Sequence, residues 1–75
     1  MSKTIQRLEE KYGITVVPDI IYNPFNGKTV NRYKMYSADG CPWENGLTIR
    51  GLQDECKKWG ETLLNIKEIV AEKWS

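Results

Sequence analysis

The segment ITVVPDIIYNPFNGKTVNRYKMY, residues 14–36, decides the fold of this chain. Its two ends are rich in β-branched and aromatic residues, which favour strands, and the sequence NPFNG separates them. Asn26-Gly27 is a strong signal for a two-residue turn, because a type I′ turn needs positive φ at both central positions. The segment therefore predicts an antiparallel β-hairpin.

A two-residue turn also predicts the register of this hairpin. It pairs Asp19 with Lys34, Ile20 with Tyr33, Ile21 with Arg32 and Tyr22 with Asn31. Opposite charges then meet across the strands, and an aliphatic residue meets an aromatic one, which are favourable pairs. The expected core face carries Pro18, Ile20, Tyr22, Tyr33 and Met35, and the wetter face carries Asp19, Ile21, Val30, Arg32, Lys34 and Tyr36. A longer NPFNGK loop with a one-residue slip would exchange the two faces.

A long amphipathic helix is the clearest pattern after the hairpin. Apolar residues recur at alternating steps of three and four, at Ile49, Leu52, Cys56, Trp59, Leu63, Ile66 and Val70. This spacing predicts one helix over about 48–72, capped by Thr48 or Asn45 and bent near Gly60. The stripe would pack against the hairpin and the first helix, or form a homodimer. Few charges flank it at the positions where coiled coils place ion pairs, which favours packing against the hairpin.

A short helix precedes the hairpin, with Ser2 or Thr4 as its N-cap and Gly13 after its last turn. It is too short to be stable alone in water, so it must dock on the rest of the chain. The expected fold is α+β, in the order short N-terminal helix, antiparallel hairpin, turn-rich loop and long C-terminal helix packed on the hairpin. At 75 residues, the chain is expected to be a single small domain, 1–75.

Composition places the chain among ordinary globular domains, with 40% hydrophobic residues and a net charge of +1. No apolar run reaches the roughly 20 residues that span a bilayer, and the start lacks the apolar region of a secretory signal. We therefore expect a cytoplasmic protein without a membrane partner.

The residues that usually carry catalysis are scarce. The chain has no histidine, so a cysteine nucleophile would lack its usual base. Cys41 has Asp39 and Glu44 nearby, and such acids raise the pKa of a thiol, whereas Cys56 lies on the apolar stripe. The two cysteines match neither a CxxC pair nor a zinc site, and no phosphate-binding or calcium-binding motif is present. We expect no enzyme activity, no metal and no cofactor.

Basic residues are concentrated on one predicted strand. Lys28, Arg32 and Lys34 lie in residues 23–38, which contain no acid. In GKTVNRYKMY they alternate with aromatic residues, a pattern suited to phosphate contact and base stacking. The segment YNPFNGKTVNRYK, residues 22–34, followed by the helix resembles the small arm-binding domains of phage integrases, although it lacks a clear third strand and the chain is near neutral. The resemblance implies nucleic-acid binding, and the charge pattern makes Lys28, Arg32 and Lys34 the expected contact residues. In the alternative interpretation, Tyr33 is core and the charges are solvated, with Lys34 paired to Asp19.

The loop YSADGCPWENG, residues 36–46, contains two turn dipeptides, Asp39-Gly40 and Asn45-Gly46. Trp43 at its centre has two interpretations. The indole either plugs the core between hairpin and helix, or it is an exposed anchor for a partner. Trp74, near the end of the chain, is a candidate second anchor.

At RYKMYSADGCPWENGL, residues 32–47, the chain resembles small accessory proteins encoded by phages and prophages of Gram-positive bacteria. The resemblance implies a protein that binds and disables one host factor, such as a CRISPR, restriction, replication or transcription component. We therefore expect a non-enzymatic inhibitor of a larger host protein, with direct nucleic-acid binding and a structural homodimer as alternatives. The expected partner-binding residues are Trp43, Tyr36, Arg32, Lys34, Asp39 and Glu44.

Overall fold

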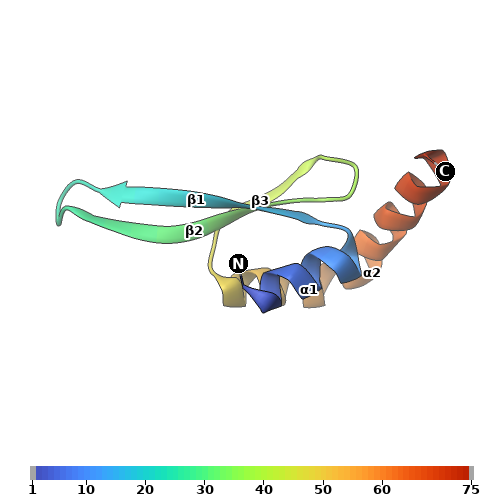
Figure 1. Cartoon of the computed structure of the whole chain (residues 1–75), viewed down its shortest axis with the longest axis horizontal. Coiled ribbons are helices and arrows are strands. Elements are labelled where there is room, and N and C mark those ends of the chain that lie inside the picture. The colour runs from blue at the N-terminus through green and yellow to red at the C-terminus, as the bar shows by residue number, and fades with distance from the viewer. Residues whose placement is uncertain (1, 75) are drawn as a thin grey trace.

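The computed structural model describes residues 2–74, apart from the side chain of Trp74, and it has an α+β fold (Figure 1). Its elements in chain order are α1 (Lys3–Tyr12), β1 (Thr15–Asn23), β2 (Lys28–Tyr36), β3 (Pro42–Leu47) and α2 (Ile49–Trp74). The strands form an antiparallel sheet in the order β1-β2-β3. α1 and the first half of α2 lie on one side of the sheet, the second half of α2 rises past one end of it, and the hairpin of β1 and β2 extends beyond the helices at the other end. The predicted fold class is confirmed, with one additional strand.

The hairpin loop is longer than predicted. Asn23 pairs with Lys28, so residues 24–27 form a four-residue loop instead of a two-residue turn. The side chain of Asn23 accepts a hydrogen bond from the Phe25 N–H at 3.0 Å, and its carbonyl accepts one from the Gly27 N–H at 2.9 Å. Gly27 closes the loop with φ 67°, a left-handed conformation that glycine adopts without steric cost. Pro24 has no N–H to donate to a ladder, so the loop begins there.

The predicted register is consequently wrong by two residues. Asp19 lies opposite Arg32 instead of Lys34, and Ile20 lies opposite Asn31 instead of Tyr33. Because side chains alternate with a period of two, a two-residue shift leaves each one on its predicted face. The division of the hairpin into two faces is therefore confirmed, although the cross-strand partners differ.

The segment expected to be a turn-rich loop contains a strand. β3 pairs with β2 through Tyr36 opposite Pro42, Met35 opposite Glu44 and Tyr33 opposite Leu47. The spacing of these pairs changes between them, which marks bulges. Gly46 has φ 65° and lies in one of the bulged stretches, so Asn45-Gly46 bends a strand instead of ending one. Only residues 37–41 remain as the connection between β2 and β3.

The hydrophobic core lies between the helices and the base of the sheet. It consists of Ile5, Ile14, Met35, Leu52, Cys56 and Leu63, with Leu8, Tyr12, Val16, Tyr33, Trp43 and Leu47 packed against it. Of the predicted core face, Met35 is buried and Tyr33 is partly buried, whereas Pro18, Ile20 and Tyr22 are exposed. A strand rises about 3.3 Å per residue and a helix 1.5 Å, so the ten-residue α1 cannot reach the outer half of a nine-residue strand.

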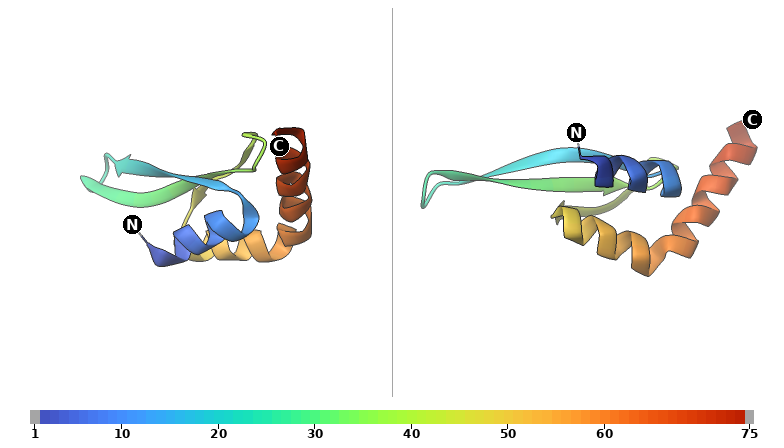
Figure 2. Two further views of the ribbon diagram at one scale, coloured as in Figure 1. Left: turned by 45° about the vertical axis from the view of Figure 1, so that its right-hand side comes forward. Right: turned by 60° about the horizontal axis from the view of Figure 1, so that its bottom comes forward.

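α2 bends at the position predicted from the sequence (Figure 2). Trp59 has non-helical φ −111° and ψ 16°, and Gly60 follows it. A Cβ atom on Gly60 would lie 3.1 Å from Cε1 of Tyr12, so the tyrosine ring occupies the space of the missing side chain. Leu52, Cys56 and Leu63 of the predicted stripe are buried, which confirms packing in the first part of the helix. Beyond Leu63, the stripe residues Ile66 and Val70 are only partly buried.

The observed helix caps agree in part with those predicted from the sequence. Gly13 ends α1 in a left-handed conformation, as predicted. Ser2 occupies the N-cap position of α1, but its side chain makes no capping hydrogen bond. The hydroxyl of Thr48 accepts a hydrogen bond from the Gly51 N–H at 3.0 Å, which confirms Thr48 as the cap of α2.

Candidate functional site

The outer part of the hairpin, residues 17–32, is the most exposed apolar feature among the described residues, and we call it the arm. Ile20 is 65% exposed, Tyr22 61% and Phe25, at the tip, 98%. Val17 and Ile21 are exposed on the other face of the same strand. β3 pairs only with residues 33–36 of β2, so the arm is a two-stranded ribbon without a core of its own.

The face of the sheet away from the helices is basic, and we call its β2 residues the basic face. Lys28, Arg32, Lys34 and Tyr36 alternate along β2 and therefore point to this side together. Asp19 lies opposite Arg32 and is the one acid among residues 17–34, which carry three cations. The guanidinium of Arg32 donates to its neighbour's carbonyl, that of Asn31, at 3.0 Å. The structure thus brings the predicted nucleic-acid-binding residues onto one surface.

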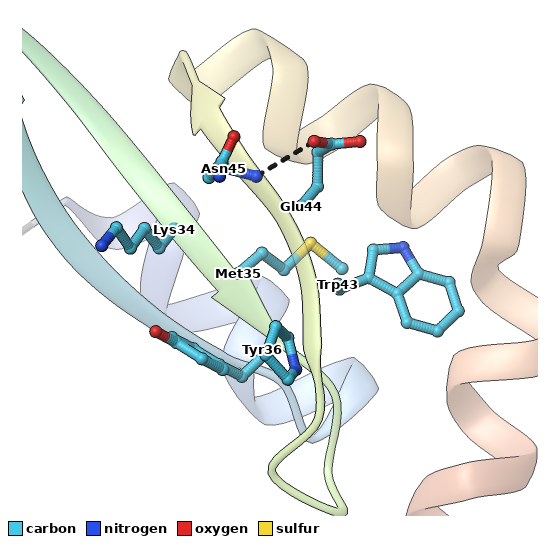
Figure 3. Close-up of a pocket in the computed structure, with 7 residues that line it drawn as sticks. Lys34, Met35, Tyr36, Trp43, Glu44 and Asn45 are labelled. Carbon is cyan, nitrogen blue, oxygen red and sulfur yellow. Dashed lines mark hydrogen bonds between the residues drawn. The ribbon is translucent and has the colours of Figure 1, made fainter.

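A groove of about 290 Å³ follows the pairing of β2 with β3 (Figure 3). Its lining residues are Lys34, Met35, Tyr36, Pro42, Trp43, Glu44 and Asn45. Figure 3 shows that Trp43 points towards α2 and Lys34 points away from it. Four of the six predicted partner-binding residues therefore line one groove, but Trp43 does not share a face with Lys34 and Tyr36.

Trp43 is partly buried and packs against the hydrophobic core. Its ring lies edge to face with that of Trp59 in α2, with the ring centroids 6.1 Å apart and the planes at 75°. This position matches the interpretation of Trp43 as a plug between hairpin and helix. Trp74, the other candidate anchor, has a side chain outside the described part of the structure.

Asp39 orders the loop between β2 and β3. Its carboxylate accepts hydrogen bonds from the Ser37 hydroxyl and from the Cys41 N–H, the latter at 3.2 Å. Ser37 is buried, and its N–H donates to the Cys41 carbonyl at 3.0 Å. The hydrogen bond from Ser37, followed by that from Cys41, lowers the pKa of Asp39. Asp39 is thus exposed, but its carboxylate is engaged within its own loop.

The two thiols are poorly suited to nucleophilic chemistry. Cys41 is exposed, and hydrogen bonding and charge from Asp39 raise its pKa. Cys56 is buried, and desolvation raises its pKa to about 11. At neutral pH both groups are therefore protonated, and a protonated thiol is a weak nucleophile.

Glu44 is exposed on β3, and its carboxylate accepts a hydrogen bond from the N–H of Asn45 at 3.1 Å. It borders a second groove as well, which has a volume of about 450 Å³. The residues lining that groove are Pro42, Trp43, Glu44, Glu55, Lys58, Trp59 and Thr62. Sequence reasoning missed this site, because it assigned Trp59 to the buried stripe, whereas Trp59 is 41% exposed.

Phe25 is the other residue that sequence reasoning passed over. The signal was present, because a phenylalanine in the turn sequence NPFNG has no neighbouring strand to cover it.

Within residues 2–74, no three histidine, cysteine or acidic residues are grouped so that they could hold a metal ion. No helix in this range has the length and apolarity needed to cross a membrane. No protein-family model matches the chain, and comparisons with curated proteins and with solved structures give no significant match.

Proposed function

We propose that this protein is a non-enzymatic binding protein whose arm inserts into a larger protein partner. The observation that carries the proposal is the exposure of Ile20, Tyr22 and Phe25 on a ribbon that extends beyond the helices. An isolated two-stranded hairpin is at best marginally stable in water, and a contiguous exposed apolar patch is typical of an interaction surface. A partner that covers the arm would stabilise the hairpin and would remove its apolar side chains from water.

The energetics support an interface of moderate affinity. Burying one fully exposed aliphatic or aromatic side chain contributes about 1.5–3 kcal/mol. Because Ile20 and Tyr22 are already about a third covered, the three residues together contribute roughly 3–7 kcal/mol before the costs of association. The basic face adds long-range attraction towards an acidic surface and thereby accelerates encounter. We infer that the partner has an apolar cleft bordered by acidic residues.

We place this partner among the host proteins that a phage-encoded inhibitor would block in the bacterial cytoplasm. The support is the resemblance to small phage and prophage proteins, together with the small size of the chain. A component of a CRISPR or restriction system, or of the replication or transcription machinery, is the proposed class of target.

The test is a pull-down from a Gram-positive lysate with matched baits. We expect Phe25→Ser and Tyr22→Ser to lose the captured partner, because each removes an exposed apolar contact without touching the core. Ile69→Ser is the control, since Ile69 is 62% exposed in the second half of α2, at the end of the molecule opposite the tip of the arm. Melting temperatures of all three variants should stay near that of the parent. If the arm variants capture the partner as well as the parent protein does, the proposal is contradicted.

Nucleic-acid binding is the second candidate, and the alignment of Lys28, Arg32 and Lys34 on one face supports it. A two-stranded ribbon fits the major groove, and lysine and arginine would contact phosphates. The expected result is a gel-mobility shift at low salt that weakens as salt rises and disappears when Arg32 and Lys34 are changed to alanine. The absence of a shift at low salt would eliminate this candidate.

The structural homodimer through α2 is the third candidate. Its support is Ile69, together with the partial exposure of Ile66 and Val70 beyond Leu63. Sedimentation equilibrium over a range of concentrations distinguishes it, because only this candidate requires a mass that doubles without any partner.

A further inference from the structure

The groove where α2 bends is built from two separate elements. Pro42, Trp43 and Glu44 come from β3, and Glu55, Lys58, Trp59 and Thr62 come from α2. It lies at the end of the sheet from which the arm points away, in a molecule 48 Å long. It is therefore separate from the surface proposed above.

Two of the residues that line this groove are tryptophans, Trp43 and Trp59. The 75° angle between the indole planes of Trp43 and Trp59 makes a corner rather than a stack. The face of an indole ring carries negative charge density from its π-system, and tryptophan is the aromatic residue that attracts cations best. A corner of two tryptophans is consequently suited to a positively charged group.

One cation of the chain itself, Lys58, already lies at the ring of Trp59. The ammonium group of Lys58 lies 5.4 Å from the centre of the Trp59 ring. Lys58 is exposed and its side chain is long and flexible, so it can leave the ring when another cation arrives. Its position shows that the ring face is open to a cation.

The charged residues that line the groove also favour a positively charged ligand. Glu44 and Glu55 line the groove on the β3 side and the α2 side, and Lys58 is the one basic residue that lines it. Once Lys58 moves aside, two carboxylates and two indoles remain. An acidic ligand would be repelled by both carboxylates, and an apolar one would desolvate them without compensation.

We propose that this groove binds an arginine side chain of a protein partner, which displaces Lys58 from Trp59. Arginine fits better than lysine, because its planar guanidinium stacks on aromatic rings and donates to carboxylates at the same time. The site does not depend on the arm, so its failure and that of the proposed function are distinguishable.

The test is an NMR titration of the indole N–H signals with acetyl-Gly-Arg-Gly-amide. Acetyl-Gly-citrulline-Gly-amide is the matched neutral ligand, since it differs by one charged group. We expect the Trp43 and Trp59 signals to move with the arginine peptide and to stay in place with the citrulline peptide. Equal shifts with both peptides, or none with either, would overturn the proposal.

Charge variants separate the site from general electrostatic attraction. Lys58→Gln should tighten binding about two- to fivefold by removing the competing cation, and Glu44→Gln or Glu55→Gln should weaken it by a similar factor. Glu10→Gln is the matched control, because it changes the net charge equally on the exposed face of α1. All four positions are exposed or partly exposed, so folding should be preserved. A Glu10→Gln effect as large as those at Glu44 and Glu55 would overturn the proposal.

Discussion

The ring of Tyr12 lies against the backbone of Gly60, with Cε1 only 3.1 Å from the place where a Cβ atom would stand. α1 therefore contacts α2 at its bend. The contact joins two elements far apart in the sequence, and it makes the identity of residue 60 a test of the fold.

We expect Gly60→Ala to lower the free energy of unfolding by about 1 kcal/mol. Overpacking costs typically 1–3 kcal/mol, and alanine recovers about 1 kcal/mol of helix propensity. Gly51→Ala is the control, because an added Cβ there would lie 3.3 Å from Cδ2 of Leu47, at the end of a flexible side chain, and 3.4 Å from the Thr48 hydroxyl, and it should be neutral or stabilising. Urea denaturation measures both variants, and a stabilised Gly60→Ala protein would contradict the packing described.

Lys67→Met should loosen the second half of α2. The Lys67 ammonium donates to the carbonyl oxygens of Glu10 and Lys11, at 2.8 and 3.2 Å, where α1 ends. Hydrogen bonds from a charged group to an exposed helix end contribute about 1 kcal/mol. Hydrogen exchange should accelerate in residues 61–73 of the variant, while protection of the β2 amides remains. Unchanged exchange in α2 would show that Lys67 does not hold it.

Trp43→Ala should destabilise the whole fold. Truncating a buried tryptophan costs about 3–5 kcal/mol, and the partial exposure of Trp43 reduces this to roughly 2–3 kcal/mol. The loss also removes the edge-to-face contact with Trp59. A melting temperature equal to that of the parent would contradict the role of Trp43 in stabilising the fold.

The loop that Asp39 orders, residues 37–41, should lose stability at acidic pH. The lowered pKa means that the native state favours the carboxylate, so its stabilisation is complete above the ordinary value of 3.8. It is lost as the pH falls through the lower native pKa. An NMR titration of Asp39 should show this low value, and Ser37→Ala should bring it closer to 3.8, because Ser37 is the main cause. A pKa that Ser37→Ala leaves unchanged would contradict the assignment.

The thiols should react at different rates. At pH 8 an aromatic disulfide reagent should modify the exposed Cys41 first and reach Cys56 only when the protein opens. The pKa of Cys56 rises from 9.0 to about 11 on folding, so the unfolded chain ionises first and stability should fall as the pH rises between these values. Cys41→Ser should remove the fast reaction; a second fast thiol in that variant would show that Cys56 is accessible.

The sequence by itself determined the order of the helices and the hairpin, the two faces of the hairpin, the end of α1 at Gly13 and the bend near Gly60. These features follow from local periodicity and from the conformational preferences of single residues, so nearby residues suffice to predict them.

Only the tertiary structure decided the third strand and the exposure of the arm, whereas the register depended on a choice between two local loop lengths. The Asn23 side chain selected the longer loop, and β3 formed because β2 offered it an edge. Ile20 and Tyr22 have the pattern of core residues, yet they are exposed, because burial depends on how far the helices reach and no local pattern encodes that distance. Position in the chain groups Trp43 with Lys34 and Tyr36, but the pairing of β3 with β2 places its ring with that of Trp59 on the side of α2.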